Sequence, residues 1–189
     1  MSLARHIALW SEDRSWIGRA LVIPIFSYIG WRSYADPLYG GPFAGVNMII
    51  HEIGHPLFSY FGEFMHVAGG TIFQLAAPIL ILIMFLRQPE YFGIPFCGVW
   101  FSTNLYGIAT YVADARAQEL PLVTLATGGG ELVEAEHDWG YLLEHFHALS
   151  MDTRIASAIR IAAFIVMWSS ILAGVWIVWV MARASKTAR

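Results

Sequence analysis

Two histidines four residues apart, with a glutamate directly after the first, are the residues in this chain best suited to chemistry: the motif His51-Glu52-x-x-His55. On an α-helix, residues four apart lie on one face, about 40° apart, so both imidazoles can reach a single metal ion. Glu52 lies about 100° round from His51, close enough to contact a water on that metal without being a ligand. The spacing therefore predicts a zinc site with a general base, and metal-assisted hydrolysis as its chemistry.

The alternative is that His51 and His55 are hydrogen-bonded between helices, with Glu52 as a partner. The composition of the chain argues against this alternative. Hydrophobic residues make up 57 % of the chain and charged residues 13 %, and the mean hydropathy is +0.56, far from the values of an ordinary soluble domain. Ionisable residues at membrane depth are costly and are retained for function, which favours the metal site.

The distribution of apolar residues predicts an all-α polytopic membrane protein, a single domain over residues 1–189, with about five transmembrane helices. The expected spans are 16–31, 42–61, 67–86, 91–115 and 155–181, each near the roughly 20 residues that a span needs. The metal motif lies near the middle of the second span. Residues 42–116 form the metal-site core, and a polar loop over 116–154 separates the fourth and fifth spans. The chain is thus expected to be an integral, multi-pass protein of a lipid bilayer.

Charge and cysteine content exclude several classes of function. The net charge is −3 and Lys186 is the one lysine, so there is no basic patch for nucleic acid. Cys97 is the single cysteine, which excludes an internal disulfide and a cysteine-based zinc site. Basic residues divide almost evenly between the two sides of the five-span topology, so they do not predict its orientation.

The fourth expected span is unusually polar in its second half. One helical stripe has spacings of four, three and four residues: Thr103, Gly107, Thr110 and Asp114. Asn104 and Tyr111 form a second stripe beside it. The simplest alternative is ordinary packing by threonine and glycine, with Asp114 at the water boundary.

Together these elements resemble the catalytic core of the site-2-protease family of intramembrane zinc metalloproteases. In that family the second core helix opens with a pattern like Ala-Gly-Pro-x-x-Asn. Here the third span opens Ala68-Gly-Gly-Thr-Ile-Phe-Gln74, with Gly70 four residues before Gln74 as the pattern requires, and Thr71 where the proline would be. The family's third core helix carries Asn-x-x-Pro-x-x-Pro-Leu-Asp-Gly. Here Asn104 precedes Asp114 by ten residues rather than eight, without the prolines.

The resemblance implies a zinc ion held by His51, His55 and Asp114, with Glu52 as the general base. It also implies that Asn104 or Gln74 helps to hold the developing oxyanion. The substrate would be a membrane protein or peptide, cleaved in or near a membrane-embedded segment. That segment would have to unwind locally, because a helical backbone is hydrogen-bonded and shielded from attack.

The third metal ligand has four alternatives to Asp114: Glu63, His66, His137 and Asp138. The first two follow His55 at too great a distance along a continuous helix, unless the chain folds back at Gly62. The last two require the polar loop to fold back over the membrane, which the triple glycine 128–130 permits. Asp114 itself lies near the end of its span while His51 lies mid-span. The zinc must therefore lie nearer one membrane face than the spans suggest, or the helix must tilt or break around Gly107.

Two other classes of function compete with a peptidase. One is a non-catalytic, metal-binding membrane subunit that keeps the fold without activity, which the loose second and third motifs favour. The other is a membrane di-iron oxygenase, which requires several histidine boxes. Outside the motif, His137, His145 and His147 are too sparse to supply them.

Overall fold

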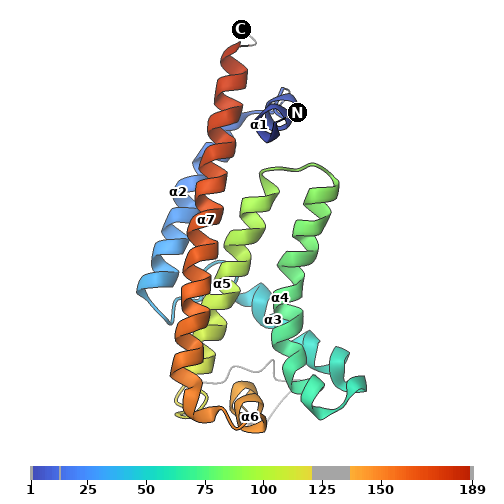
Figure 1. The fold of residues 1–189 in the computed structure, drawn as a ribbon, viewed down its shortest axis with the longest axis vertical. Helices are drawn as coiled ribbons and strands as arrows, with labels where there is room; N and C mark the ends of the chain where they lie inside the picture. The colour runs from blue at the N-terminus through green and yellow to red at the C-terminus, as the bar shows by residue number, and fades with distance from the viewer. Residues whose placement is uncertain (1, 13, 121–136, 188–189) are drawn as a thin grey trace.

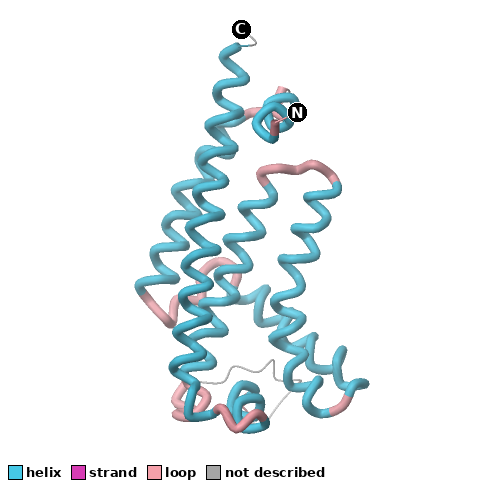
Figure 2. The backbone as a smooth tube through the Cα atoms, viewed as in Figure 1, coloured by secondary structure: helices cyan, strands magenta, loops and turns pink. Residues whose placement is uncertain are grey.

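The computed structural model describes residues 2–12, 14–120 and 137–187. In these ranges all regular secondary structure is helical, and the helices form an elongated bundle (Figures 1 and 2). The expected all-α fold is therefore confirmed for the described part of the chain. The triple glycine 128–130 lies outside the described residues.

The elements follow one another in this order: α1 Leu3–Trp10, α2 Trp16–Ala35, α3 Ala44–Phe58, the 3-10 turn η1 Ser59–Phe61, α4 Glu63–Arg87, α5 Gly93–Ala113, α6 Asp138–His145, the 3-10 turn η2 Leu149–Met151, and α7 Asp152–Thr187. Both termini lie at one end of the bundle, and α6 lies across the other end (Figure 1). The molecule thus has two distinct ends, and α6 defines the one discussed below.

The main core lies where α2, α5 and α7 pack together. Its buried side chains come from all three helices: Phe26, Ile29, Val99, Tyr106, Ala163, Met167 and Ile171. The Ser102 hydroxyl of α5 also donates a hydrogen bond of 2.6 Å to the Ala163 carbonyl of α7. These contacts pack α5 tightly against α7, and α2 packs on the same pair of helices.

Helix α3 packs against α4 at glycines. A methyl group on Gly54 would lie 2.3 Å from the Gly69 carbonyl oxygen, and one on Gly69 would lie 2.6 Å from the Gly54 carbonyl oxygen. Only glycine permits this approach of two backbones. The paired glycines at the start of the third expected span therefore bring the metal-motif helix directly against its neighbour.

The α6 end of the bundle is tied to α5 and α7 by an ion pair. Arg116, just after α5, donates to both carboxylate oxygens of Asp152 at the start of α7, at 2.8 and 2.9 Å. Asp152 is buried, and its hydrogen bonds hold the pKa of the Arg116 guanidinium above the usual value. The bidentate geometry fixes the corner between the two helices.

Helix boundaries differ from the expected spans in two places that affect the site. The second expected span began at Pro42, but α3 begins at Ala44 and ends at Phe58; at 15 residues it is about 22 Å long, short of a roughly 30 Å hydrocarbon core. The expected link 62–66 is instead a turn at Gly62, with φ +96°, followed directly by α4. The chain reverses here, so the start of α4 lies alongside the end of α3.

Two of the described helices are long and apolar enough to cross a membrane. They are α4 and the stretch Leu149–Ser185, with mean hydropathies of 2.1 and 2.3 over their best windows. Only 22 % and 28 % of those windows is buried inside the protein. A core helix of a soluble protein would be mostly buried, so these helices present apolar surface outward.

Candidate metal centre

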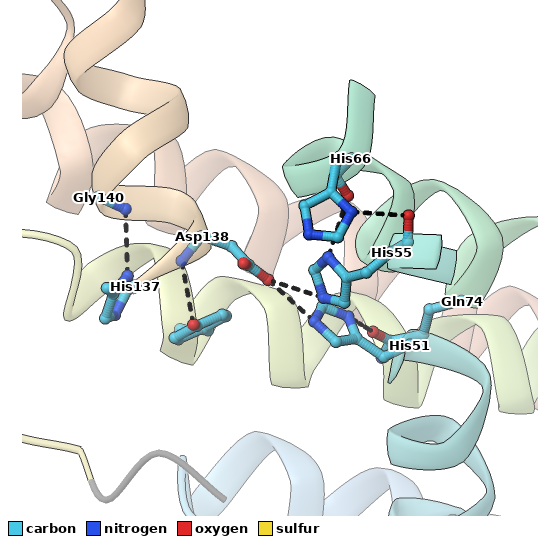
Figure 3. A network of polar contacts seen from close by, with 8 residues as sticks. His51, His55, His66, Gln74, His137, Asp138 and Gly140 are labelled. Atoms are coloured by element: carbon cyan, nitrogen blue, oxygen red, sulfur yellow. Dashed lines mark hydrogen bonds and ion pairs between the residues drawn. The ribbon is translucent and has the colours of Figure 1, made fainter. Parts of the chain in front are cut away.

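Three potential metal ligands converge near the α6 end of the bundle: His51, His55 and Asp138. Their donor atoms all lie within 4.8 Å of one another. One oxygen of Asp138 lies 2.9 Å from Nε2 of His51 and 3.5 Å from Nε2 of His55. Figure 3 shows this carboxylate pointing at both imidazole rings. Two histidines and one carboxylate are a ligand set typical of catalytic zinc sites.

Asp138 is placed by the N-terminus of α6. His137 caps that helix by accepting a hydrogen bond at Nδ1 from the Gly140 amide, at 3.1 Å. The Asp138 amide donates to the Tyr111 hydroxyl of α5, at 3.2 Å, and the ring of Tyr111 packs on that of His137 with centroids 4.1 Å apart. The last turn of α5 thus holds the residue that faces the α3 histidines.

The orientation of His51 is determined by a chain of hydrogen bonds through two amides. The main-chain carbonyl oxygen of Gln74 can only accept a hydrogen bond. The side-chain atom of Asn104 that lies 3.4 Å from it must therefore be the amide nitrogen. The Asn104 oxygen then accepts from the Gln74 side-chain nitrogen at 2.9 Å. That leaves the Gln74 side-chain oxygen toward Nδ1 of His51, at 3.1 Å. Nδ1 of His51 must therefore carry the hydrogen.

His55 is oriented in the same sense by a reciprocal pair of bonds with His66. Nδ1 of His55 lies 3.0 Å from the His66 carbonyl oxygen, and Nδ1 of His66 lies 2.9 Å from the His55 carbonyl oxygen. A carbonyl oxygen only accepts, so Nδ1 of each ring carries a hydrogen. The turn at Gly62 makes this pairing possible, because it places His66 beside His55.

Nδ1 of each ring is thus occupied, and Nε2 of each ring faces the Asp138 carboxylate, within hydrogen-bond distance for His51. Such a group is held together either by a proton between Nε2 of His51 and the carboxylate, 2.9 Å apart, or by a metal ion that all three side chains bind. Outer hydrogen bonds that fix the tautomer of metal-binding histidines are the usual support of zinc sites. The donor set and its supports therefore fit a zinc ion.

Gly70 of α4 leaves the space that the two rings occupy. A methyl group there would lie 2.7 Å from Cε1 of His51 and 2.7 Å from Nε2 of His55. Any side chain at this position would displace the rings from their hydrogen-bond partners. The two rings thus require a glycine at position 70, and the packing of α3 on α4 requires one at position 69.

Replacing Gly70 with alanine should therefore lower zinc affinity at least tenfold without unfolding the bundle, because the two rings must swing away from Gln74 and His66. Competition with a zinc chelator measures the affinity, and circular dichroism measures the helix content. Gly45→Ala on α3 is the matched control, since a methyl group there meets nothing within 4 Å. Unchanged zinc affinity in Gly70→Ala would contradict the assignment of these rings.

Glu52 faces the same cavity as the three ligands. The cavity has a volume of about 690 Å³, and its walls come from α3, α4, α5 and the start of α6. Glu52 and Asp138 are the two acidic residues in its described lining. Unlike Asp138, Glu52 makes no side-chain hydrogen bond or ion pair with the described residues. Glu52 thus shares the cavity with the three candidate ligands.

The structure does not bring Asp114, the expected third ligand, to the two histidines. Asp114 ends α5, where its carboxylate accepts hydrogen bonds from the amides of Glu119 and Leu120 at 2.9 and 3.1 Å. One of its oxygens also lies 3.4 Å from Nε2 of His137. Asp114 thus fixes the chain directly after α5 and contacts His137. Asp138, not Asp114, is the carboxylate that lies beside His51 and His55.

Asn104, the expected oxyanion donor, is also placed differently. It is 1 % exposed, and both of its amide atoms are bonded to Gln74. Asn104 and Gln74 are therefore bonded to each other and orient His51, and of the two only Gln74 lines the cavity. Sequence reasoning missed this role, and that of His66, because both depend on contacts between helices.

The remaining candidate ligands stay away from the centre. Glu63 is exposed on the first turn of α4, and His145 packs on Phe64 with ring centroids 4.9 Å apart. No second group of metal ligands occurs among the described residues. The described part of the chain therefore offers ligands for one metal ion rather than two.

Comparisons with models of known families, with curated proteins and with solved structures find no match for this chain.

Proposed function

We propose that this chain is a zinc-dependent intramembrane metallopeptidase. The observation that supports this most strongly is the convergence of two imidazole Nε2 atoms and one carboxylate, with Glu52 facing the same cavity. A structural zinc site is closed by four protein ligands, whereas a catalytic site has three and leaves a position for water. Three ligands beside an open cavity match the second case.

A multi-pass arrangement in a bilayer is supported by the outer surface of the bundle. Beyond the two helices already named, large apolar side chains on α2 and α3 are about half exposed: Leu21, Ile25, Tyr28, Ile49, Ile53 and Leu57. Such a continuous apolar surface is unusual for a soluble monomer. Lipid around the bundle would account for it, with the short helix α3 packed against the longer α4.

The chemistry proposed is hydrolysis of an amide bond. Zinc at this centre would supply a Lewis acid that lowers the pKa of a water molecule toward about 7. Glu52 would accept a proton from a water molecule in the cavity and pass it to the leaving amine. Gln74 and His66 keep both imidazoles in the tautomer that leaves Nε2 free.

The same observations rank the two competing functions. A di-iron oxygenase needs ligands for two metal ions, and the described residues offer one group of three. A non-catalytic metal-binding subunit has no use for a carboxylate that faces the cavity beside the metal ligands without a partner in the described structure. Glu52 therefore favours the hydrolase.

Metal analysis of the purified, detergent-solubilised protein tests the proposal. We expect one zinc per chain in the wild type and none in His51→Ala or His55→Ala, because a single imidazole does not anchor the ion. Two irons per chain would instead indicate an oxygenase. Absence of metal from the wild type, or full zinc occupancy in either variant, would overturn the assignment.

A further inference from the structure

The two ends of the bundle carry opposite charge. We call the end that holds both termini the terminal end; it comprises residues 2–12, 14–19 and 87–93 and the last two turns of α7 (Figure 1). Its acidic residues in the described chain are Glu12 and Glu90. Its basic residues are three times as many: Arg5, Arg14, Arg19, Arg87, Arg183 and Lys186. The terminal end is therefore cationic.

The α6 end has the opposite balance. It comprises residues 59–66, 113–120 and 137–154, and its basic residues are Arg116 and Arg154. Its acidic residues are three times as many: Glu63, Asp114, Glu119, Asp138, Glu144 and Asp152. The charge of the bundle is thus strongly asymmetric along its long axis, and the metal centre lies toward the anionic end.

Aromatic rings accompany the cations at the terminal end. The guanidinium groups of Arg14 and Arg19 lie 4.8 and 5.1 Å from the centre of the Trp10 ring. Trp10 also packs edge-on against Tyr91, with ring centroids 5.5 Å apart. Tryptophan and tyrosine concentrate at membrane–water interfaces, and arginine beside them extends its charged group toward the headgroups. The terminal end thus has the composition of an interfacial surface.

Helix α1 adds an amphipathic element to this surface. It lies beside the last turns of α7 (Figure 1) and buries Ile7 against Val180 and Met181. Leu3 and Leu9 remain about half exposed. A short helix with one apolar side free suits the plane of the headgroups.

The path of the chain places the two ends on opposite sides of a bilayer. The basic residues divide evenly only if all five expected spans cross, but α3 is too short to cross and the chain reverses at Gly62. Both strongly apolar helices, α4 and the stretch Leu149–Ser185, run from the α6 end toward the terminal end, and α5 returns between them. Residues 2–19 therefore come to the same side as residues 87–93.

We propose that the terminal end binds the anionic headgroups of the cytoplasmic leaflet, so that the metal centre opens on the opposite side of the membrane. This inference rests on the membrane placement in the proposed function and adds its orientation. Membrane proteins hold an excess of lysine and arginine on the cytoplasmic side, and anionic lipids of that leaflet attract them. Even with Arg32 and Arg160 counted toward the α6 end, six basic residues stand against four. A substrate then reaches the zinc site from the non-cytoplasmic side.

Cysteine labelling in intact spheroplasts tests the orientation. Tyr60→Cys at the α6 end, where the native side chain is 91 % exposed, should react with a membrane-impermeant maleimide before lysis. Leu3→Cys at the terminal end, where the native side chain is 55 % exposed, should react only after lysis. The wild type is the control, because its single cysteine, Cys97, is 1 % exposed and should not react. Reaction of Leu3→Cys before lysis, or of Tyr60→Cys only after it, would overturn the orientation.

Lipid retention tests the contact with headgroups. Protein purified from micelles with equal amounts of phosphatidylglycerol and phosphatidylcholine should retain an excess of phosphatidylglycerol. The double variant Arg5→Gln with Arg87→Gln should lower the ratio of the two lipids about fivefold or more, because each cation near an anionic surface contributes about that factor. Arg154→Gln, an equally exposed arginine at the α6 end, is the matched control and should leave the ratio unchanged. Equal retention of both lipids by the wild type, or an unchanged ratio in the double variant, would overturn the contact.

Both experiments are independent of the metal. None of the substituted residues lines the cavity of the metal centre, and labelling requires no zinc. Reversed labelling would overturn the orientation and leave the metal centre standing, whereas a wild type without zinc would overturn the metal centre and leave the orientation.

Discussion

Replacing Glu52 with glutamine is expected to leave one zinc per chain and to abolish hydrolysis. Glutamine has the same shape but cannot accept a proton, and loss of a general base costs about 10²–10⁴ in rate. The metal should remain because Glu52 is not among the three converging ligands. The measurement pairs metal analysis with cleavage of a fluorescent single-span peptide reconstituted with the protein in vesicles.

Glu63→Gln is the matched control for this prediction, because Glu63 is exposed at the start of α4 and does not line the cavity. It should retain both zinc and cleavage. If Glu52→Gln lost zinc as readily as His55→Ala, Glu52 would be a ligand and the proposed mechanism would be wrong. If it kept full activity, another group would have to move the proton.

Replacing Asp138 with asparagine is expected to weaken zinc binding by more than the 10–100-fold that loss of an outer-shell partner typically costs. The neutral amide keeps the shape of the side chain but removes the charge that faces Nε2 of His51 and His55. Zinc affinity, measured by chelator competition, should fall while the helix content stays constant.

Asp114→Asn is the comparison that decides between the two aspartates. An amide oxygen there can still accept one of the two backbone bonds from Glu119 and Leu120, so zinc affinity should change by less than tenfold. The opposite order, with Asp114→Asn losing zinc and Asp138→Asn retaining it, would contradict the proposed ligand set His51, His55 and Asp138. It would restore the arrangement that the resemblance to site-2 proteases implied.

Local spacing alone was enough to place His51, Glu52 and His55. A period of 3.6 residues puts positions four apart on one face, whatever the rest of the chain does. The helical fold could also be predicted from the sequence, because its apolar runs are as long as membrane-spanning helices. The close approach of α3 and α4 at Gly54 and Gly69 appeared only in the structure.

The third candidate ligand, a carboxylate, could not be predicted from the spacing of residues along the chain. Asp114 and Asp138 are both compatible with a ligand role, and they are separated by a stretch whose path no local pattern determines. In the structure, Tyr111 and the cap formed by His137 bring the start of α6 to the histidines. These are contacts between residues distant in the sequence, and their free energies depend on which helices meet.

The residues that orient the two imidazoles were likewise determined only by the tertiary structure. His66 reaches His55 because the chain reverses at Gly62, and Asn104 orients His51 only through Gln74, on the helix between them. The sequence by itself determined that His51 and His55 share one face of a helix, because that geometry is intrinsic to the helix. The tertiary structure decided which residues surround them, because hydrogen-bond direction and burial arise only when separate helices pack.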